Sequence, residues 1–170
     1  MSTIQICQIK YKNLIVDIGL FPIVFIPVET TCKNGTCSGD LKTYHTPAFV
    51  RIYSSRGMLK ASSYHKKCER CQYKYYFSYT QSKEGVKTFT HEALNSEFLL
   101  ISSRTAFEWV YLRSTADIIE NTGSSFTAIS DSYESTFLEP LDEMRLEEGY
   151  FISRLLKLYS ESCRPLQVRL

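Results

Sequence analysis

The stretch KCERCQYKYY, residues 67–76, places Cys68 and Cys71 between basic residues and a run of aromatic side chains. A second close pair, Cys32 and Cys37, lies earlier in CKNGTC, residues 32–37. Each pair can form a tight turn that presents two thiolates, and Asn-Gly in the first turn tolerates a positive φ. Two such pairs, brought together by the chain between them, have the spacing of a tetrahedral metal site.

Four sulfur ligands in a closed site suit a structural zinc ion, Zn²⁺. The basic residues Lys66, Lys67 and Arg70 surround the second pair and favour thiolate over thiol. His45 and His65 could each replace one cysteine, but a core or surface histidine is the commoner case. The sequence therefore predicts one structural zinc ion bound by Cys32, Cys37, Cys68 and Cys71.

Disulfides and unconnected thiols are the alternatives to a metal site. Disulfides require an oxidising compartment, and the apolar segment 14–28 is a poor signal peptide because Asp17 and two prolines interrupt it. The same segment is too short and too broken to span a bilayer. A thioredoxin-like C-x-x-C would begin a helix, whereas the residues after Cys71 are strand-like. We interpret Cys7 and Cys163 as buried small hydrophobic residues.

Composition indicates a globular chain, and charge is unevenly distributed along it. The 170 residues are 44% hydrophobic and 22% charged, with a net charge of +2. Residues 42–74 hold eight Lys and Arg against one acid, whereas residues 84–148 hold thirteen acids against four bases. This asymmetry predicts either an anionic partner for the basic half or packing of the two halves on each other.

The basic half has the pattern of a small antiparallel sheet. Residues 48–53 alternate like a strand, residues 54–57 have turn chemistry, and residues 58–64 form a return strand. A third, aromatic strand is predicted over residues 73–79. So few short strands bury little apolar area, and a zinc ion would add the missing stability. We therefore expect a zinc-ribbon-like β module over residues 31–82, preceded by strands and an extended segment over residues 1–30.

The acidic half is predicted to be helical. One helix is expected from Thr90 to about Ile101, a second from a capping box at residues 105–108 to about Glu120, and a third over residues 130–137. Asp142 is expected to cap a last helix, whose apolar stripe comprises Phe151, Leu155, Leu158 and Tyr159. The predicted fold class is α+β, a small zinc-ribbon-like antiparallel β module followed by a bundle of about four α-helices over residues 83–170.

The two cysteine pairs, the basic hairpin between them and the aromatics after them resemble the cysteine-cluster (CxC) domains that accompany KDZ transposases and occur in some HMG-box proteins. The segments 89–97, 105–109 and 148–156 resemble later parts of that family, so the likeness extends over about residues 28–160. The resemblance implies a zinc-binding accessory module of mobile-element origin. It also implies that the family's zinc ligands correspond to Cys32, Cys37, Cys68 and Cys71.

No catalytic constellation is recognisable. A zinc deaminase needs H-x-E before P-C-x-x-C, whereas here His91 and Glu92 are adjacent and follow Cys71. There is neither a P-loop nor a G-x-S-x-G motif. The acidic pairs at residues 131 and 134 and at residues 142 and 143 are interpreted as helix caps and solvated faces. We therefore expect no enzymatic activity and no small-molecule substrate.

Two classes of function remain. In the first, the module binds DNA or RNA through its basic hairpin, in the nucleus. In the second, it is a protein-interaction or scaffolding domain in which zinc only holds the fold, and its partner is another protein or the rest of a longer transposon-encoded chain. Neither involves a membrane. The candidate nucleic-acid contacts are Arg51, Arg56, Lys60, Lys66, Lys67 and Arg70.

Overall fold

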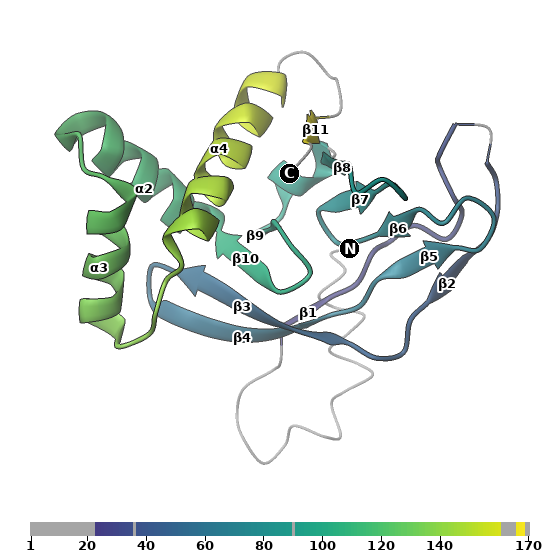
Figure 1. Cartoon of the computed structure of the whole chain (residues 1–170), viewed down its shortest axis with the longest axis horizontal. Helices are drawn as coiled ribbons and strands as arrows, with labels where there is room; N and C mark the ends of the chain where they lie inside the picture. Colours follow the sequence, from purple (N-terminus) through teal and green to yellow (C-terminus); the bar gives the residue numbers. More distant parts are fainter. Residues whose placement is uncertain (1–22, 36, 90, 161–165, 169–170) are drawn as a thin grey trace.

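The computed structural model describes residues 23–35, 37–89, 91–160 and 166–168. These residues form two β-sheets and three α-helices, which gather at one end of the molecule (Figure 1). Of the strands expected over residues 1–30, β1 (Ile23–Phe25) is within the described part. Cys7 and Cys163 lie outside the described residues.

The first sheet is built around the predicted basic hairpin. Ala48 lies opposite Ser63 and Ser54 opposite Gly57, which confirms the two strands and their turn. Gly57 has a φ of +103°, and a Cβ there would lie 3.2 Å from the ring of Phe137, so only glycine fits without strain. In spatial order the strands are β1, β4 (Gly57–Ser63), β3 (Ala48–Ser54), β10 (Thr105–Glu108) and β9 (Phe98–Leu100).

The second sheet is antiparallel throughout and carries the second cysteine pair. The single strand expected over residues 73–79 is instead two short strands joined by a turn at Phe77 and Ser78. In spatial order the strands are β11 (Leu166–Val168), β8 (Lys87–Phe89), β7 (Tyr79–Gln81), β6 (Lys74–Tyr75), β5 (Lys66–Cys68) and β2 (Leu41–Thr43).

The two sheets share one hydrophobic core. The ring of Phe25 in β1 lies 5.0 Å from that of Phe77 and 6.1 Å from that of Phe98, measured between centroids. A buried lysine crosses from the second sheet to the helices. The ammonium of Lys87 donates to the carbonyl of Ile101 at 2.7 Å and pairs with Glu148 at 3.1 Å. These contacts pack the strands that precede residue 82 in the sequence and the strands that follow it into one body.

The helices are α2 (Trp109–Thr122), α3 (Phe126–Phe137) and α4 (Glu143–Ser160). The carboxylate of Asp142 accepts a hydrogen bond from the amide of Arg145 at 3.2 Å, so the predicted cap of α4 is confirmed. The third predicted helix exists but begins earlier, because the hydroxyl of Ser125 caps it by accepting from the amide of Ala128 at 3.1 Å.

The predicted α+β architecture, a small ribbon followed by about four helices, is wrong. Within the described part of the segment from Thr90 to Ile101, the structure has a 3₁₀ helix η1 (His91–Asn95) and strand β9. Four consecutive apolar residues, 98–101, are buried there, which is typical of a strand covered on both faces. Their positions also fit a helical period, so spacing alone could not separate the two structures.

The predicted capping box at residues 105–108 is also wrong, because these residues form β10, which lies parallel beside β3. Glu108 occupies the N-cap position of α2 without a capping side-chain bond. Its carboxylate instead accepts hydrogen bonds from the amide and the hydroxyl of Ser55, at 2.9 and 2.8 Å. Tertiary contact with the hairpin turn thus replaces the local cap.

The apolar stripe predicted for the last helix faces solvent. Phe151 is 50% exposed and Leu158 is 68% exposed. The opposite face is buried through Leu146, Ile152 and Leu156. That face packs closely because it includes Gly149, where a Cβ would lie 2.8 Å from the ring of Phe107. The apolar stripe that the sequence pattern singled out is therefore not the face of α4 that contacts the core.

Candidate metal centre

The first cysteine pair lies in a tight loop closed by backbone hydrogen bonds. The amide of Cys32 donates to the carbonyl of Gly39 at 2.8 Å, and the amide of Cys37 donates to that of Asn34 at 2.9 Å. Gly35 adopts a φ of +53°, so the left-handed turn expected from Asn34-Gly35 is present. This loop directs both thiols to one side.

The second pair lies in the turn between β5 and β6. The amide of Gln72 donates to the carbonyl of Cys68 at 2.9 Å, and the amide of Cys68 donates to the carbonyl of Tyr73 at 2.9 Å. The first loop approaches this turn so closely that a Cβ on Gly39 would lie 3.1 Å from the sulfur of Cys68. Glycine at residue 39 therefore lets the two loops meet.

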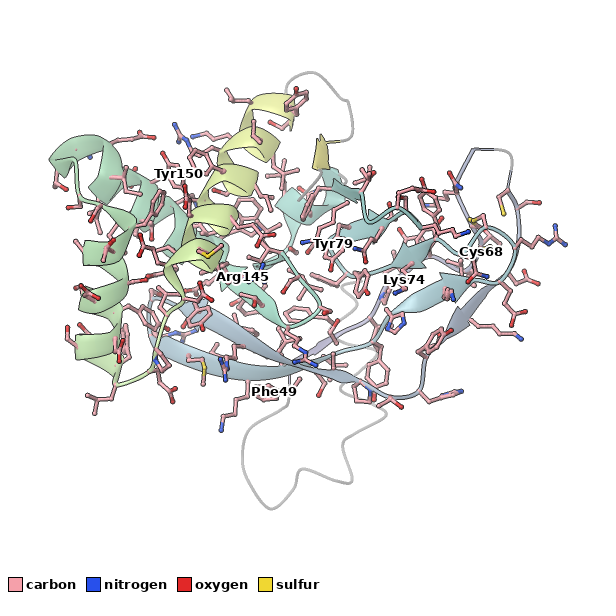
Figure 2. All side chains as sticks on the ribbon, viewed as in Figure 1. Phe49, Cys68, Lys74, Tyr79, Arg145 and Tyr150 are labelled. Carbon is pink, nitrogen blue, oxygen red and sulfur yellow. The ribbon has the colours of Figure 1, made fainter. Side chains whose placement is uncertain are left out.

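The four sulfurs converge at one end of the molecule, where Cys68 is labelled in Figure 2. Cys32 Sγ lies 3.4 Å from Cys71 Sγ, and Cys37 Sγ lies 3.7 Å from Cys68 Sγ. All four sulfurs lie within 4.8 Å of one another. A tetrahedral zinc site with Zn–S bonds of about 2.3 Å has sulfurs about 3.8 Å apart. The contacts are far longer than a disulfide bond of about 2.05 Å, so the cluster fits a metal ion held by four thiolates.

Burial and hydrogen bonding act in opposite directions on the thiols. Burial raises the pKa of Cys32 to about 12, although the hydroxyl of Tyr75 counteracts part of that effect. Burial also acts to raise the pKa of Cys71, but hydrogen bonds from the backbone of Tyr73 and from Cys32 outweigh it and bring the value to about 7. A bound cation would remove the cost of holding several buried thiolates together.

Tyr75 is a site residue that the sequence did not single out. Its buried hydroxyl donates to Cys32 Sγ at 3.3 Å and accepts from the amide of Lys33 at 2.7 Å. Burial and the bond to Cys32 both raise the pKa of Tyr75, so this hydroxyl stays a hydrogen-bond donor at neutral pH. Outer partners of this kind orient metal ligands. The aromatic run after Cys71 was the available signal, but only the register of β6 distinguishes Tyr75 from its neighbours.

The cysteines form a small core separate from the main one. Cys32, Cys68 and Tyr75 are buried together, and the partly buried Leu41 and Tyr73 pack against them. His45 and His65 are not among the described residues that converge on the sulfurs. The ring of His65 instead stacks between those of Tyr44 and Tyr76.

The basic residues named from the sequence lie in two places. Arg51 is exposed directly opposite Lys60 across the hairpin, and Arg56 is exposed at its turn. The remaining three lie beside the cysteines on the second sheet. Of these, the ammonium of Lys66 donates to the carbonyl of Glu29, while Lys67 and Arg70 belong to β5 and the turn that follows it.

None of the helices in the described residues is long and apolar enough to cross a membrane.

Comparisons with known proteins agree with the geometry of the cysteine cluster. No curated protein and no solved structure matches the chain. A family described as a CxC5-like cysteine cluster associated with KDZ transposases matches residues 20–137, more than half of the sequence and all four converging cysteines. The resemblance noted from the sequence is confirmed, and the chain belongs to the CxC5-like cysteine cluster family associated with KDZ transposases.

Proposed function

We propose that this chain is a non-catalytic, zinc-stabilised module that contacts nucleic acid through the β3–β4 hairpin and acts in the nucleus. The observation that carries the proposal is the pairing of Arg51 with Lys60 on adjacent strands. Like charges directly opposite each other destabilise a sheet. A polyanion bound across the hairpin would offset the repulsion between Arg51 and Lys60, because its phosphates would lie between the two cations.

The zinc assignment rests on the donor set. Four cysteine sulfurs in a closed, largely buried cluster are the ligands of structural zinc sites. Zinc with four thiolates carries a formal charge of −2, which offsets part of the positive charge beside it. The hairpin of the first sheet is therefore the better candidate for the main phosphate contacts.

An alternative account would have the acidic helices neutralise the hairpin. The helices instead contact the hairpin through aromatic side chains. Tyr133 of α3 lies 5.7 Å from Tyr53, and Phe137 packs against Gly57. No described carboxylate forms an ion pair with Arg51, Arg56 or Lys60. These contacts leave the charges of the hairpin available to an external anion.

The double variant Arg56→Glu with Lys60→Glu tests the proposal. Binding of duplex DNA, with a dissociation constant of roughly 10⁻⁴ to 10⁻⁶ M at physiological salt, should weaken for every sequence, and its salt dependence should become flatter. The matched control is Lys83→Glu with Lys157→Glu, which changes the net charge equally at exposed positions elsewhere. Fluorescence anisotropy over a salt series and thermal melting should be measured on both variants.

An unchanged affinity in the hairpin variant would contradict the proposal. Equal losses in both double variants would also contradict it, because net charge alone would then explain the binding. A fall in melting temperature without a change in DNA binding would instead support internal neutralisation by the helices.

The second candidate function is a protein-interaction domain. The specific observation in its favour is the exposed apolar stripe of α4, which includes Phe151, Leu155 and Leu158. This candidate predicts no DNA affinity, or affinity insensitive to salt. The same salt series therefore separates the two functions.

A further inference from the structure

One face of the second sheet carries a row of three lysines on neighbouring strands. Lys67 in β5 lies directly opposite Lys42 in β2 on one side and Lys74 in β6 on the other. Lys42 forms an exposed ion pair with Glu69 at 2.6 Å. Neither Lys67 nor Lys74 forms an ion pair with a described carboxylate. Lys67 and Lys74 are therefore directly opposed cations whose repulsion costs stability unless an anion approaches them.

A row of stacked rings lies beside the lysine row. Tyr44 stacks on His65, with centroids 4.5 Å apart and planes 16° apart. His65 stacks in turn on Tyr76, with centroids 5.5 Å apart. Each ring is two residues from one of the lysines along the chain, just beyond the end of the lysine's strand. The amide of Tyr44 donates to the carbonyl of His65 at 3.0 Å, and Tyr44 lines one cavity with Lys42 and Lys67, so the exposed end of the ring row lies beside the lysine row.

The ring row runs from solvent into the core. Tyr44 is 45% exposed, whereas Tyr79, which stacks on Tyr76 at 4.7 Å, is 3% exposed. The inner rings therefore hold the outer ones in place. Burial lowers the pKa of His65, and Lys74 and Lys67 lower it further, so this ring is uncharged at neutral pH. The exposed end is thus a preorganised aromatic surface with cations along one side.

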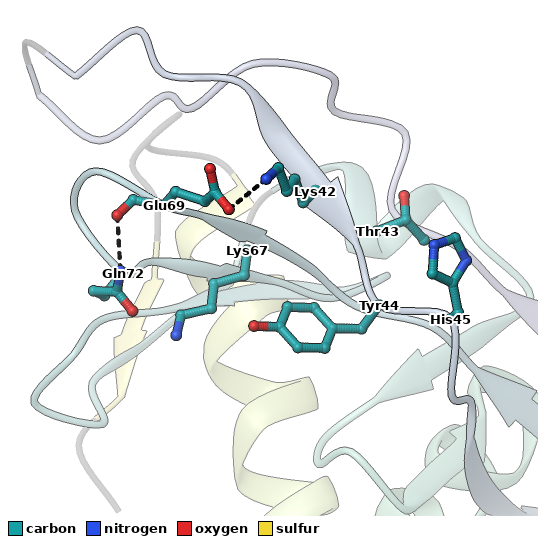
Figure 3. Close-up of a pocket in the computed structure, with 7 residues that line it drawn as sticks. All are labelled: Lys42, Thr43, Tyr44, His45, Lys67, Glu69 and Gln72. Carbon is teal, nitrogen blue, oxygen red and sulfur yellow. Dashed lines mark hydrogen bonds and ion pairs between the residues drawn. The ribbon is translucent and has the colours of Figure 1, made fainter.

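Tyr44 and two lysines of the row also line an open cavity of about 570 Å³ (Figure 3). In that view the hydroxyl of Tyr44 points toward the side chain of Lys67, whereas the ring of His45 points away from it. Figure 2 shows the third lysine, Lys74, between Tyr79 in the middle of the molecule and Cys68 at its end. An aromatic ring and basic side chains therefore line one cavity next to the metal centre.

We propose that this face binds single-stranded nucleic acid, with a base stacked on Tyr44 and its phosphates held by Lys67 and Lys74. The inference deepens the nucleic-acid function proposed above and rests on it. Single strands suit such a surface because their bases expose a π-face, and stacking is tolerant of sequence. In a duplex the bases already stack on one another, so duplex binding by the hairpin would not require Tyr44.

The test compares Tyr44→Ala with Phe151→Ala, which removes another exposed ring from α4, an element that belongs to neither proposed nucleic-acid surface. Fluorescein-labelled oligomers of thymidine and of uridine, about 15 nucleotides long, and a DNA duplex are titrated with zinc-loaded protein. Tyr44→Ala should weaken binding of the single strands roughly 5- to 150-fold and leave duplex binding unchanged. Phe151→Ala should change neither, and Tyr44→Phe should retain single-strand binding because the ring remains.

Lys67→Gln with Lys74→Gln should weaken single-strand binding and flatten its salt dependence. The variant Tyr44→Trp gives a second readout, because an indole stacked on a base loses fluorescence, while the natural Trp109 is buried and serves as the background. Zinc content and melting temperature of each variant establish that the fold is intact.

Unchanged single-strand affinity in Tyr44→Ala would overturn the inference, and so would equal losses on single strands and duplex. Displacement by a polyglutamate peptide as efficient as by the uridine oligomer would also overturn it, since charge alone would then be recognised. In each case the function proposed above stands if reversal of Arg56 and Lys60 still reduces duplex binding. If the native protein binds neither single strands nor duplex, both proposals fail.

Discussion

At the cysteine end of the molecule, Cys32, Cys68 and Tyr75 are buried in a small core of their own, whereas 22 of the described residues form the core shared by the two sheets and the helices. Figure 1 shows the helices and the turn of the curved β3–β4 hairpin at one end of the molecule, and β2 and β5 of the cysteine region at the other. Burial of apolar side chains can stabilise the larger region without help. Three buried residues cannot do so for the smaller one.

This difference indicates where a metal ion would contribute to stability. The loops that carry the cysteines and the short strands β2, β5 and β6 have little other apolar contact, so metal binding and local folding should be coupled there. The hairpin belongs to the larger region through β10, even though it lies between the two cysteine pairs in sequence. The basic half of the chain therefore contains both strands that the metal would stabilise and strands that the main core stabilises.

The largest effect is expected from Cys68→Ser combined with Cys71→Ser. Removing two of four thiolates should abolish stoichiometric zinc binding, which in small zinc sites is worth about 10–16 kcal/mol. The measurement is elemental analysis of purified protein. Cys7→Ser with Cys163→Ser, at positions outside the described residues, is the matched control and should retain one zinc per chain. A double variant of Cys68 and Cys71 that keeps its metal would refute the site.

Removing the metal with a chelator should separate the two regions. Amides of β2, β5 and β6 should exchange their hydrogens much faster, while those of β3 and β10 keep their protection, because the main core does not depend on the metal. Hydrogen–deuterium exchange followed by mass spectrometry checks this expectation. Simultaneous opening of both regions would show that they form one cooperative unit.

Leu146→Ala examines the helical end. Leu146 is fully buried in α4, so its truncation should destabilise the protein by about 2–5 kcal/mol and leave zinc content unchanged in the folded protein. Leu158→Ala removes an equal side chain from the exposed face of the same helix and should cost less than about 0.5 kcal/mol. Urea denaturation gives both values. Loss of zinc from folded Leu146→Ala would show that the two ends are coupled.

A smaller effect is expected from Tyr75→Phe. The ring still fills the small core, but Cys32 loses the hydrogen bond that orients its sulfur. Zinc affinity should fall by about tenfold, measured by competition with a chromogenic chelator. Tyr73→Phe is the control, because Tyr73 packs against the same cluster. An identical zinc affinity in Tyr75→Phe and the native protein would mean that this hydroxyl serves only packing.

Local patterns were enough to predict several features. The spacing of the cysteine pairs predicted which four would converge, because a turn of a few residues limits where two thiols can point. The alternation over residues 48–63 predicted the hairpin, and Asp142 was recognised as a helix cap. In the hairpin and the cap the decisive contacts join residues close in sequence. In the cysteine cluster only the spacing within each pair is local, because the sulfurs that meet are 31 and 39 residues apart.

Other features depended on partners far away in sequence. The buried run at residues 98–101 is compatible with a helix or a strand until β10 lies beside it, and β10 itself forms because β3 provides a parallel neighbour. The outward face of α4 could not be predicted, because apolar residues occur on both of its faces and only contact with Phe107 selects one.

The sequence by itself determined the metal-binding chemistry, because that depends on residue type and short spacing. Tertiary structure alone decided the extent of the two sheets, the role of Tyr75 and the alignment of the lysine row beside the rings of Tyr44 and His65. These depend on strand register, and a shift by one residue would move every side chain to the other face of the sheet.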